Sequence, residues 1–343
     1  MIKKEAYGMV GDKQVYKYTI TNKNNNSLVV SDYGATILNL FINKNNRSYD
    51  VALGYNNLAG YFNNGEFIGC VVSPTCNRIN LGRFEIAGVN YQMQQNDRGN
   101  NLHTHNSLGA RNMIMDVQTR DQQIVFSCHF NDGLAGLPGE KDFKVSYLFD
   151  DDNQLIIDYE MITDKESLFN PTQHCYFNLN GHDSGSILKH KMLIKASNIT
   201  EVNDTLIPTG KLLDVTGSPF DFRREKEVGQ DADDVSLSAT GGYDHNYALD
   251  NYDGSLKEVA HLIGDKSQIK MTILTQMPGL QVYGGNFLQR ADGKNGATYS
   301  KNGGIALETQ FYPDNINHPE FASSLIKAQQ KKAYRTIYRF ENI

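Results

Sequence analysis

Short runs of alternating apolar and polar residues dominate this chain. Alternation with a period of two is typical of β-strands that bury one face, and turn residues separate the runs. The pattern predicts hairpins at Arg83–Met93, Asp116–Phe130 and Phe143–Ile162. Further strands are expected at Gln14–Asn22, Leu28–Ile42 (two runs broken at Asp32-Tyr33-Gly34), Tyr49–Tyr55, Phe67–Val72, Met192–Ala196, Asp244–Leu249, Gln268–Thr275, Leu280–Tyr283, Ile305–Phe311 and Tyr334–Phe340.

Helical periodicity is scarce. One short helix is expected near Pro319–Lys327, where Pro319 suits a first turn. Many short strands with turn residues between them indicate an all-β sandwich or barrel. No linker, composition break or internal repeat marks a boundary, so residues 1–343 are expected to form a single large domain.

The stretch Asn170–Gly181 combines this alternation with chemistry. In an extended strand its side chains fall on two faces, one apolar enough to sit on a core and one that carries an imidazole among hydrogen-bonding groups. The apolar face holds Cys175, Phe177 and Leu179, and the polar face holds His174, Tyr176 and Asn178. The segment alone fits a half-exposed strand with a surface histidine as well as it fits a functional site.

Three other predicted strands carry polar groups on one face in the same way. Those faces hold Glu308 with Gln310, Gln281 with Tyr283, and Asp244 with Asn246. Each strand alone is compatible with an ordinary surface facing solvent. If the four faces line one sheet, they form a cleft rich in planar hydrogen-bonding groups. Such a cleft suits polyhydroxylated ligands, because each sugar hydroxyl both donates and accepts hydrogen bonds.

Composition narrows the class of protein. The net charge is -6 and no basic run occurs, so nucleic acid is not an expected partner. The four cysteines, at positions 70, 76, 128 and 175, have neither CxxC nor metal-ligand spacing and are expected to be small buried hydrophobes in a reducing compartment. Neither a signal peptide nor an apolar run of ~20 residues is present, so no membrane is expected and the expected location is the cytoplasm.

The usual cofactor signatures are missing from the sequence. No GxGxxG follows a strand, and GxxxxGK[ST], HExxH and GxSxG do not occur. His103 and His105 form an HxH pair, but no further spaced ligand completes a metal set, so we expect no metal. Arg78 is either a plain surface arginine or a fixed donor at the edge of the cleft. No cofactor is therefore expected.

Five ordered stretches together resemble the aldose 1-epimerase (galactose mutarotase) family. They run from Asn77 to His103, Gln173 to Gly181, Tyr243 to Tyr247, Gln281 to Phe287 and Leu307 to Asn317, the last with a Glu-Thr-Gln…Pro-Asp signature. The resemblance implies a large antiparallel β-supersandwich with few short helices. It also implies an isomerase that interconverts the α and β anomers of a free aldose, such as galactose or glucose, without metal or nucleotide.

The resemblance further implies residue roles. Opening a pyranose removes the proton of the O1 hydroxyl while the ring oxygen is protonated, so one base and one acid act on neighbouring oxygens of the same carbon. Glu308 would be the base and His174 the acid, with the roles exchanged when the ring recloses. His103 would be a second donor near the same oxygens. The residues that would hold the sugar hydroxyls are Asn77, Arg78, Tyr176, Asp244 and Gln281.

The chain departs from the family's pattern beside His103. Thr104-His105 stands where the family usually has two glycines, and the chain contains no tryptophan although one often follows there. Larger side chains are expected to reshape that rim of the cleft. They could favour a different hexose, a disaccharide such as maltose, or a modified sugar.

Other functions remain open at this stage. A hexose-6-phosphate 1-epimerase needs clustered basic residues near the cleft. Arg78 is the only basic residue of the five stretches that we expect there, although Arg83 and Arg111 lie close in sequence. A non-catalytic sugar-binding protein predicts a damaged acid or base, and a glycoside hydrolase could use Glu308 with Asp244. The expected partner is a monosaccharide or disaccharide, bound by a monomer or a homodimer.

Overall fold

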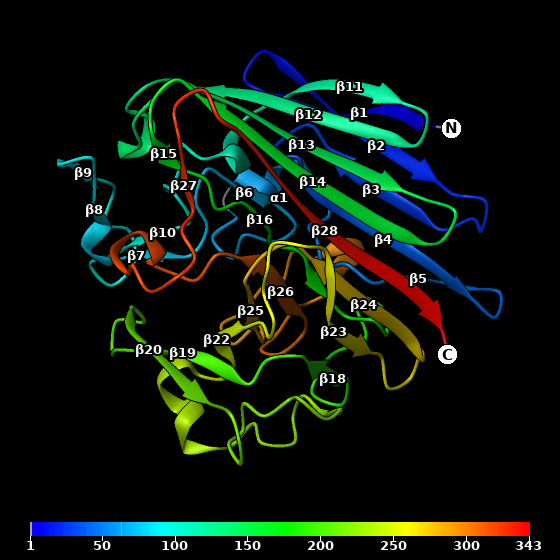
Figure 1. Ribbon diagram of the computed structural model, residues 1–343. Coiled ribbons are helices and arrows are strands. Elements are labelled where there is room, and N and C mark those ends of the chain that lie inside the picture. The colour runs from blue at the N-terminus through cyan, green and yellow to red at the C-terminus, as the bar shows by residue number, and fades with distance from the viewer. Residues whose placement is uncertain (1, 63) are drawn as a thin grey trace.

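Strands dominate the structure, a computed structural model that describes residues 2–62 and 64–343 (Figure 1). The sheets are antiparallel. The first larger sheet is a meander of β1 (Ile2–Val10), β2 (Lys13–Thr21), β3 (Ser27–Ser31), β4 (Ile37–Lys44) and β5 (Arg47–Asp50). The predicted all-β fold, a large antiparallel sandwich, is confirmed.

The second larger sheet has nine strands. Their spatial order is β11 (Asp116–Arg120), β12 (Gln123–Phe130), β13 (Lys141–Phe149), β14 (Gln154–Thr163), β28 (Lys331–Asn342), β24 (Ile269–Thr275), β23 (Lys257–Ile263), β18 (Lys191–Ile194) and β21 (Lys226–Glu227). The last strand along the chain, β28, therefore lies in the middle of the sheet, and it is the red strand between β14 and β24 in Figure 1.

The third larger sheet has six strands and carries the polar side chains discussed below. Their order is β17 (Tyr176–Phe177), β26 (Ile305–Gln310), β25 (Gly279–Tyr283), β22 (Asp244–Ala248), β19 (Asn198–Val202) and β20 (Pro208–Asp214). Two-stranded pairs add β6 (Val71–Val72) with β16 (Thr172–Gln173), β7 (Arg78–Ile79) with β10 (Asn101–Leu102), β8 (Arg83–Ile86) with β9 (Val89–Gln92), and β15 (Ser167–Leu168) with β27 (Leu325–Ile326).

Helices in the described part of the chain are few and short, as predicted. They are α1 (Leu58–Phe62) and the 3₁₀ helices at Asn80–Gly82, Ala110–Asn112, Leu134–Gly136, Val235–Thr240, Lys294–Gly296 and Asn315–Asn317. None of these helices has the length and apolar character needed to cross a membrane.

A hydrophobic cluster joins the three larger sheets. It contains Ile20 from the first sheet, Phe126 from the second and Leu307 from the third. Tyr338 of β28 packs on Phe177, with ring centroids 5.2 Å apart, and its hydroxyl donates to the carbonyl oxygen of Leu307 at 3.0 Å. The nine-stranded sheet thus covers one face of the six-stranded sheet, whose other face is left for polar side chains.

The three predicted hairpins are confirmed as β8–β9, β11–β12 and β13–β14. Two other strand predictions are too long. The strand expected at Tyr49–Tyr55 ends at Asp50, whose carboxylate accepts a hydrogen bond from the backbone N–H of Leu40 at 3.1 Å. Of Phe67–Val72 only Val71–Val72 is a strand, because Phe67 has φ +58°, outside the β region.

The predicted helix at Pro319–Lys327 is wrong. The backbone N–H of Ser324 donates to the side chain of Asn315 at 2.8 Å, and Leu325–Ile326 then pairs with β15. These long-range partners satisfy backbone groups that a helix would have paired locally. The α-helix at Leu58–Phe62 is too short for helical periodicity to reveal it.

The stretch Asn170–Gly181 forms two short strands, β16 and β17, rather than one. His174 lies between them and bonds elsewhere: its N–H donates to the carbonyl of Cys70, and its carbonyl accepts from the N–H of Gly69, both at 2.9 Å. The predicted alternation holds, with Cys175, Phe177 and Leu179 in the hydrophobic cluster. The interpretation as a half-exposed strand is wrong, because both faces are buried.

All four cysteines are free. Cys70, Cys76 and Cys175 are buried, as expected, whereas Cys128 on β12 is only partly buried. Burial still raises the pKa of the Cys128 thiol to about 12. Thiolate is the reactive form, so these side chains act as small packing residues.

Candidate active site

Four neighbouring strands bring together the polar faces that the sequence placed on separate segments. The strands β17, β26, β25 and β22 are consecutive in the six-stranded sheet. Their register sets Glu308 opposite Gln281 and Gln281 opposite Asn246. Leu280, Val282 and Leu307 belong to the hydrophobic cluster. The polar residues that alternate with them along the strands therefore point to the other face. The four faces therefore line one sheet, as a shared cleft requires.

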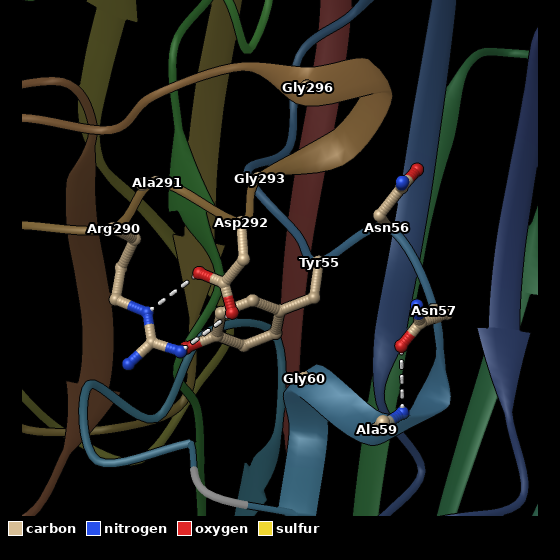
Figure 2. A pocket seen from close by; sticks show the side chains of 10 residues that line it. All are labelled: Tyr55, Asn56, Asn57, Ala59, Gly60, Arg290, Ala291, Asp292, Gly293 and Gly296. Atoms are coloured by element: carbon tan, nitrogen blue, oxygen red, sulfur yellow. Dashed lines mark hydrogen bonds and ion pairs between the residues drawn. The ribbon is translucent and has the colours of Figure 1, made fainter.

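One candidate for the functional site is a pocket of about 420 Å³ next to α1 (Figure 2). Arg290 makes a bidentate contact with Asp292, at 3.1 and 2.9 Å, and lies over the ring of Tyr55. Asn57 accepts from the N–H of Ala59 at 3.0 Å. These polar groups of the pocket bond to one another, so we place the candidate site elsewhere.

A second cavity of about 520 Å³, called the polar cavity below, contains the candidate chemistry. All eight residues predicted from the sequence line it, namely Asn77, Arg78, His103, His174, Tyr176, Asp244, Gln281 and Glu308. The other lining residues are Gly65, Glu66, Phe67, Asp97, Arg98, Leu102, Leu206, Thr240, Tyr283 and Phe287. Of these, Tyr283 shares a strand face with Gln281, and Leu102 and Phe287 lie in the stretches that resemble the family, but none of the ten was predicted as a site residue.

His174 and Glu308 form a buried pair in this cavity. His174 Nε2 lies 3.6 Å from Glu308 Oε1, and the two side chains are 5% and 3% exposed. Burial, with a smaller effect of Arg111, lowers the pKa of His174 to about 4. Burial and the nearby Asp244 raise the pKa of Glu308 well above its ordinary range. The lowered pKa of His174 and the raised pKa of Glu308 therefore favour a pair that holds one proton.

Several polar atoms of the cavity have no hydrogen-bond partner among the described residues. They include Nδ1 of His174, Oε1 of Gln281 and Oε2 of Glu308, and all three are buried. A buried polar group without a partner costs about 1–3 kcal/mol. Groups of this kind, gathered in one cavity, fit a ligand that supplies several hydrogen bonds, as a sugar does.

His103 is held in one tautomer by Asn77. The backbone N–H of Asn77 donates to Nδ1 of His103 at 3.2 Å, and the N–H of His103 donates back to the carbonyl of Asn77 at 3.1 Å. A ring that accepts at Nδ1 carries its proton on Nε2. Burial lowers the pKa of His103 well below its ordinary range, so the ring is neutral and Nε2–H is a donor.

This tautomer bears on metal binding. His103, His174 and Glu308 place ligand atoms within 4.8 Å of one another. A metal would need the lone pair of Nε2, but the hydrogen bond from Asn77 keeps the proton there. His105 does not join the set, because its Nδ1 accepts from the N–H of Ser107 at 3.0 Å. The geometry thus favours a hydrogen-bonding cluster over a metal site.

The predicted influence of Thr104-His105 on the rim of the cleft is wrong. Thr104 is fully buried, and its hydroxyl donates to the carbonyl of Thr75 at 2.8 Å and accepts from the N–H of Thr75 at 3.0 Å. Its φ of +69° belongs to a tight turn in which the N–H of His105 donates to the carbonyl of His103 at 2.8 Å. Neither Thr104 nor His105 lines the polar cavity.

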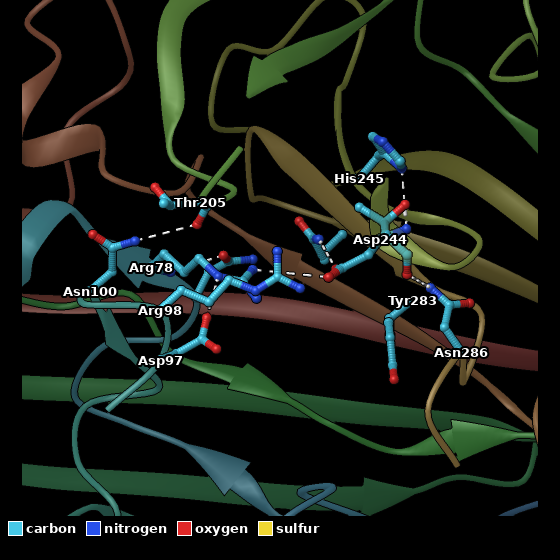
Figure 3. Close-up of polar contacts among 12 residues, drawn as sticks. Arg78, Asp97, Arg98, Asn100, Thr205, Asp244, His245, Tyr283 and Asn286 are labelled. Carbon is cyan, nitrogen blue, oxygen red and sulfur yellow. Dashed lines mark hydrogen bonds and ion pairs between the residues drawn. The ribbon is translucent and has the colours of Figure 1, made fainter. Parts of the chain in front are cut away.

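A polar network fixes one wall of the polar cavity (Figure 3). Arg78 Nε donates to Asp97 Oδ2 at 2.8 Å, and its Nη1 lies 4.0 Å from Asp244 Oδ2. Gln281 Nε2 donates to Asp244 Oδ1 at 2.7 Å. Arg98 lies at the exposed edge, with its Nη1 3.5 Å from the carbonyl oxygen of Asp204. The wall therefore presents preoriented donors and acceptors, which a ligand need not order on binding.

Tyr176 forms a wall rather than a free donor. Its hydroxyl donates to the backbone carbonyl of Glu66 at 2.9 Å, and its ring packs edge-on against Tyr283 with centroids 5.9 Å apart. The same ring lies 5.1 Å from that of His174. An aromatic wall of this kind can cover the apolar face of a sugar ring.

Replacing Asp97 with Asn is expected to raise KM roughly tenfold with a smaller change in kcat. The substitution weakens the charge-assisted bond that fixes Arg78, a residue that the resemblance implies holds a sugar hydroxyl in ground and transition states alike. Steady-state kinetics on a free aldose would measure both constants. Asp158→Asn is the matched control. Asp158 accepts two hydrogen bonds from Arg335, at 2.6 and 2.9 Å, and neither residue lines the polar cavity. Equal KM values for D97N and D158N would contradict the assignment.

Comparisons with known proteins show which family the chain matches. Residues 16–339 match the family described as aldose 1-epimerase. Galactose mutarotase of Mus musculus is 34% identical over 316 residues, which cover 92% of this chain and 91% of that protein. Aldose 1-epimerase of Escherichia coli K12 is 32% identical over 322 residues and 92% of both chains. The solved structure of the GalM/aldose epimerase homologue from C. elegans has a TM-score of 0.87 and 28% identity, covering 95% of this chain and 98% of that one.

Proposed function

The chain belongs to the aldose 1-epimerase family and is an isomerase, and we propose that Glu308 and His174 interconvert the α and β anomers of a free aldose such as galactose or glucose. The observation that carries the assignment of these residues is the buried pair itself. Its facing atoms are 3.6 Å apart, and each of the two side chains has a buried atom without a hydrogen-bond partner in the described part of the chain.

Ring opening needs one proton to leave O1 and another to reach the ring oxygen. When His174 carries the shared proton, Glu308 accepts the O1 proton while His174 protonates the ring oxygen. The open-chain aldehyde then rotates about C1–C2. The pair is now in its other state, with its one proton on Glu308. As the ring closes on the opposite face, Glu308 gives this proton to O1 while His174 takes back the proton of the former ring oxygen. Opening and closing thus use the two states in turn, and the pair needs no proton from solvent.

The remaining residues of the polar cavity hold the sugar in this proposal. Nε2–H of His103 donates to the reacting oxygens and stabilises negative charge as it develops on O1. Arg78, Asp244 and Gln281 fix hydroxyls on one wall, with Asn77 beside them. Tyr176 covers a ring face. Orientation by several fixed groups keeps both reacting oxygens within reach of the acid and base.

Polarimetry of freshly dissolved α-D-galactose and α-D-glucose tests the proposed function. We expect the wild-type protein to bring the optical rotation to its equilibrium value faster than buffer alone, in proportion to enzyme concentration. A rate equal to that of buffer with both sugars would overturn the proposal.

A sugar phosphate is the second candidate substrate, and the lining of the cavity disfavours it. Glu66, Asp97, Asp244 and Glu308 line it against only two arginines, and Arg78 is already paired with Asp97. A phosphate calls for unpaired cations. Arg83 and Arg111 do not line the cavity. Glucose 6-phosphate is therefore expected to compete poorly with glucose, and strong competition would favour the second candidate.

The pH dependence of kcat/KM is expected to be a broad bell. As pH falls through about 4, the pair takes up a second proton and no base remains. As pH rises through the raised pKa of Glu308, the pair loses its proton and no acid remains. Kinetics from about pH 3.5 to 9, corrected for spontaneous mutarotation, would measure both limbs. An acid limb near the ordinary histidine pKa of 6.5 would contradict this proton count.

We also propose a single domain over residues 1–343 and a location in the cytoplasm. One hydrophobic cluster that draws on all three larger sheets supports a single domain. Four free cysteines support a reducing compartment.

A further inference from the structure

Phe67 contacts both imidazoles of the polar cavity. Its ring centroid lies 4.5 Å from that of His103 and 5.7 Å from that of His174. Its φ of +58° is unfavourable for an aromatic residue, so the surrounding structure must hold it in place. Asn64 does so: its carbonyl accepts from the N–H of Phe67 at 3.2 Å, and its side chain accepts from the N–H of Ile68 at 2.8 Å.

Arg111 lies against the same ring without lining the polar cavity. Its guanidinium carbon is 4.2 Å from the ring centroid of Phe67, a cation–π distance. Nη1 donates to the carbonyl of Asn64 at 2.9 Å, and Nη2 donates to the carbonyl of Asn106 at 2.6 Å. Two carbonyls on separate segments therefore fix the guanidinium plane, and one of them belongs to the residue that holds Phe67.

We propose that Arg111 is a positioning residue for the epimerase reaction: through Phe67 it holds His103 and His174 in place, and its fixed positive charge favours their neutral state. The inference rests on the proposed function. It uses a residue that contacts neither the cavity nor the reacting atoms, and that the mechanism above does not employ.

Two physical effects carry the proposal. The first is geometric, because Phe67 is the ring that contacts both imidazoles, and a misplacement of about 1 Å costs up to 100-fold in rate. The second is electrostatic, because a nearby positive charge disfavours a second one on an imidazole. For His174, Arg111 lowers the pKa after the larger effect of burial. For His103, burial, His174 and Arg78 each lower the pKa more than Arg111 does.

Other groups around His174 must be weighed against Arg111. Glu308 faces it from β26, His103 from the segment after β10, and Tyr176 from β17. Cys70 contacts its backbone, and burial raises the pKa of that thiol to about 12. Burial raises the pKa of Glu308, Tyr176 and Cys70 and lowers that of His103, so it favours the neutral form of all four groups. Compared with these four groups, Arg111 is the one that carries a permanent charge near His174.

Arg111→Gln and Arg111→Lys separate the two effects. In R111Q we expect the acid limb of kcat/KM to move up by about half to one pH unit, because the opposing charge is gone. We expect kcat to fall roughly tenfold with KM little changed, since Phe67 and the imidazoles lose their support. R111K keeps the charge but not the planar group, so its acid limb should stay in place while kcat falls.

Arg47→Gln is the matched control. Arg47 lies over the ring of Tyr49 at 4.7 Å on β5, so the substitution removes a cation–π contact and a charge without touching the polar cavity. Imidazole NMR titration of the protein alone gives a second readout that needs no activity: the pKa values of His174 and His103 should rise in R111Q and not in R47Q. An unshifted acid limb in R111Q, or a wild-type kcat in both Arg111 variants, would overturn the inference.

Failure of this inference is distinguishable from failure of the proposed function. Wild-type protein that does not accelerate mutarotation removes the proposed function. Active wild-type protein with unaffected Arg111 variants removes only the role of Arg111. If R111Q does not fold, R111K still decides, because a wild-type kcat in R111K contradicts the role given to the planar guanidinium.

Discussion

Glu308→Gln is expected to lower kcat by at least about 10³-fold, one of the two largest effects expected among the substitutions considered for this protein. Glutamine has the shape of glutamic acid but can neither accept the O1 proton nor return it. Glu308 is 2% exposed and lies opposite Gln281 in the register, so the substituted side chain keeps the same place in the sheet. Polarimetry at saturating aldose would measure kcat directly.

The stability of E308Q should stay close to that of the wild type. Burial raises the pKa of Glu308 well above its ordinary range and so favours the neutral carboxyl group, which the substitution replaces with a neutral amide of the same shape. Asp32→Asn is the matched control, because Asp32 is a buried acid outside the polar cavity whose pKa burial raises to about 6. An E308Q enzyme as active as D32N would mean that Glu308 is not the base.

His174→Asn is expected to lower kcat roughly 10²- to 10⁴-fold, because general acid catalysis at the ring oxygen is lost. The residual activity should also lose the acid limb near pH 4, since no imidazole remains to be protonated. Asparagine keeps a donor and a similar volume near the position of the ring. Loss of kcat without a comparable rise in KM would show that the interaction belongs to the transition state.

His245→Asn provides the comparison for H174N. His245 is buried on β22, burial lowers its pKa to about 4, and its Nδ1 accepts from the N–H of Asp244 at 3.1 Å. It does not line the polar cavity, although its neighbour Asp244 does. An effect of H245N as large as that of H174N would mean that any buried histidine near this sheet matters, and would contradict a specific acid role.

The sequence was enough to predict which side chains share a face of a strand, but not which faces other segments bury. Alternation along a strand decides which side chains share a face, so Glu308, Gln281 and Asp244 were placed correctly before their strands were known to be neighbours. Burial depends on the layers that other segments provide. For this reason, the stretch with His174 was compatible with a surface strand, although the structure buries both of its faces.

Loop residues of the cavity had no periodic signal. Phe67 was assigned to a strand because it begins an apolar run, but its left-handed conformation takes it out of the sheet and against two histidines. Asp97 and Arg98 come from a turn between short strands, where alternation says nothing about direction. The expected effect of Thr104 on the rim of the cleft was wrong for a related reason. The size of its side chain could be read from the sequence, but its positive φ and its burial could not.

The position of β28 has a consequence for how the newly synthesised chain folds. This strand pairs with β14 on one side and β24 on the other, and its Tyr338 supports the carbonyl of Leu307, next to Glu308. A ribosome delivers β28 after all the strands that it joins. Until it inserts, two open sheet edges are templates for aggregation. Chains cut before residue 331 should therefore be insoluble rather than partly active, and catalytic competence should arrive in one late step of folding.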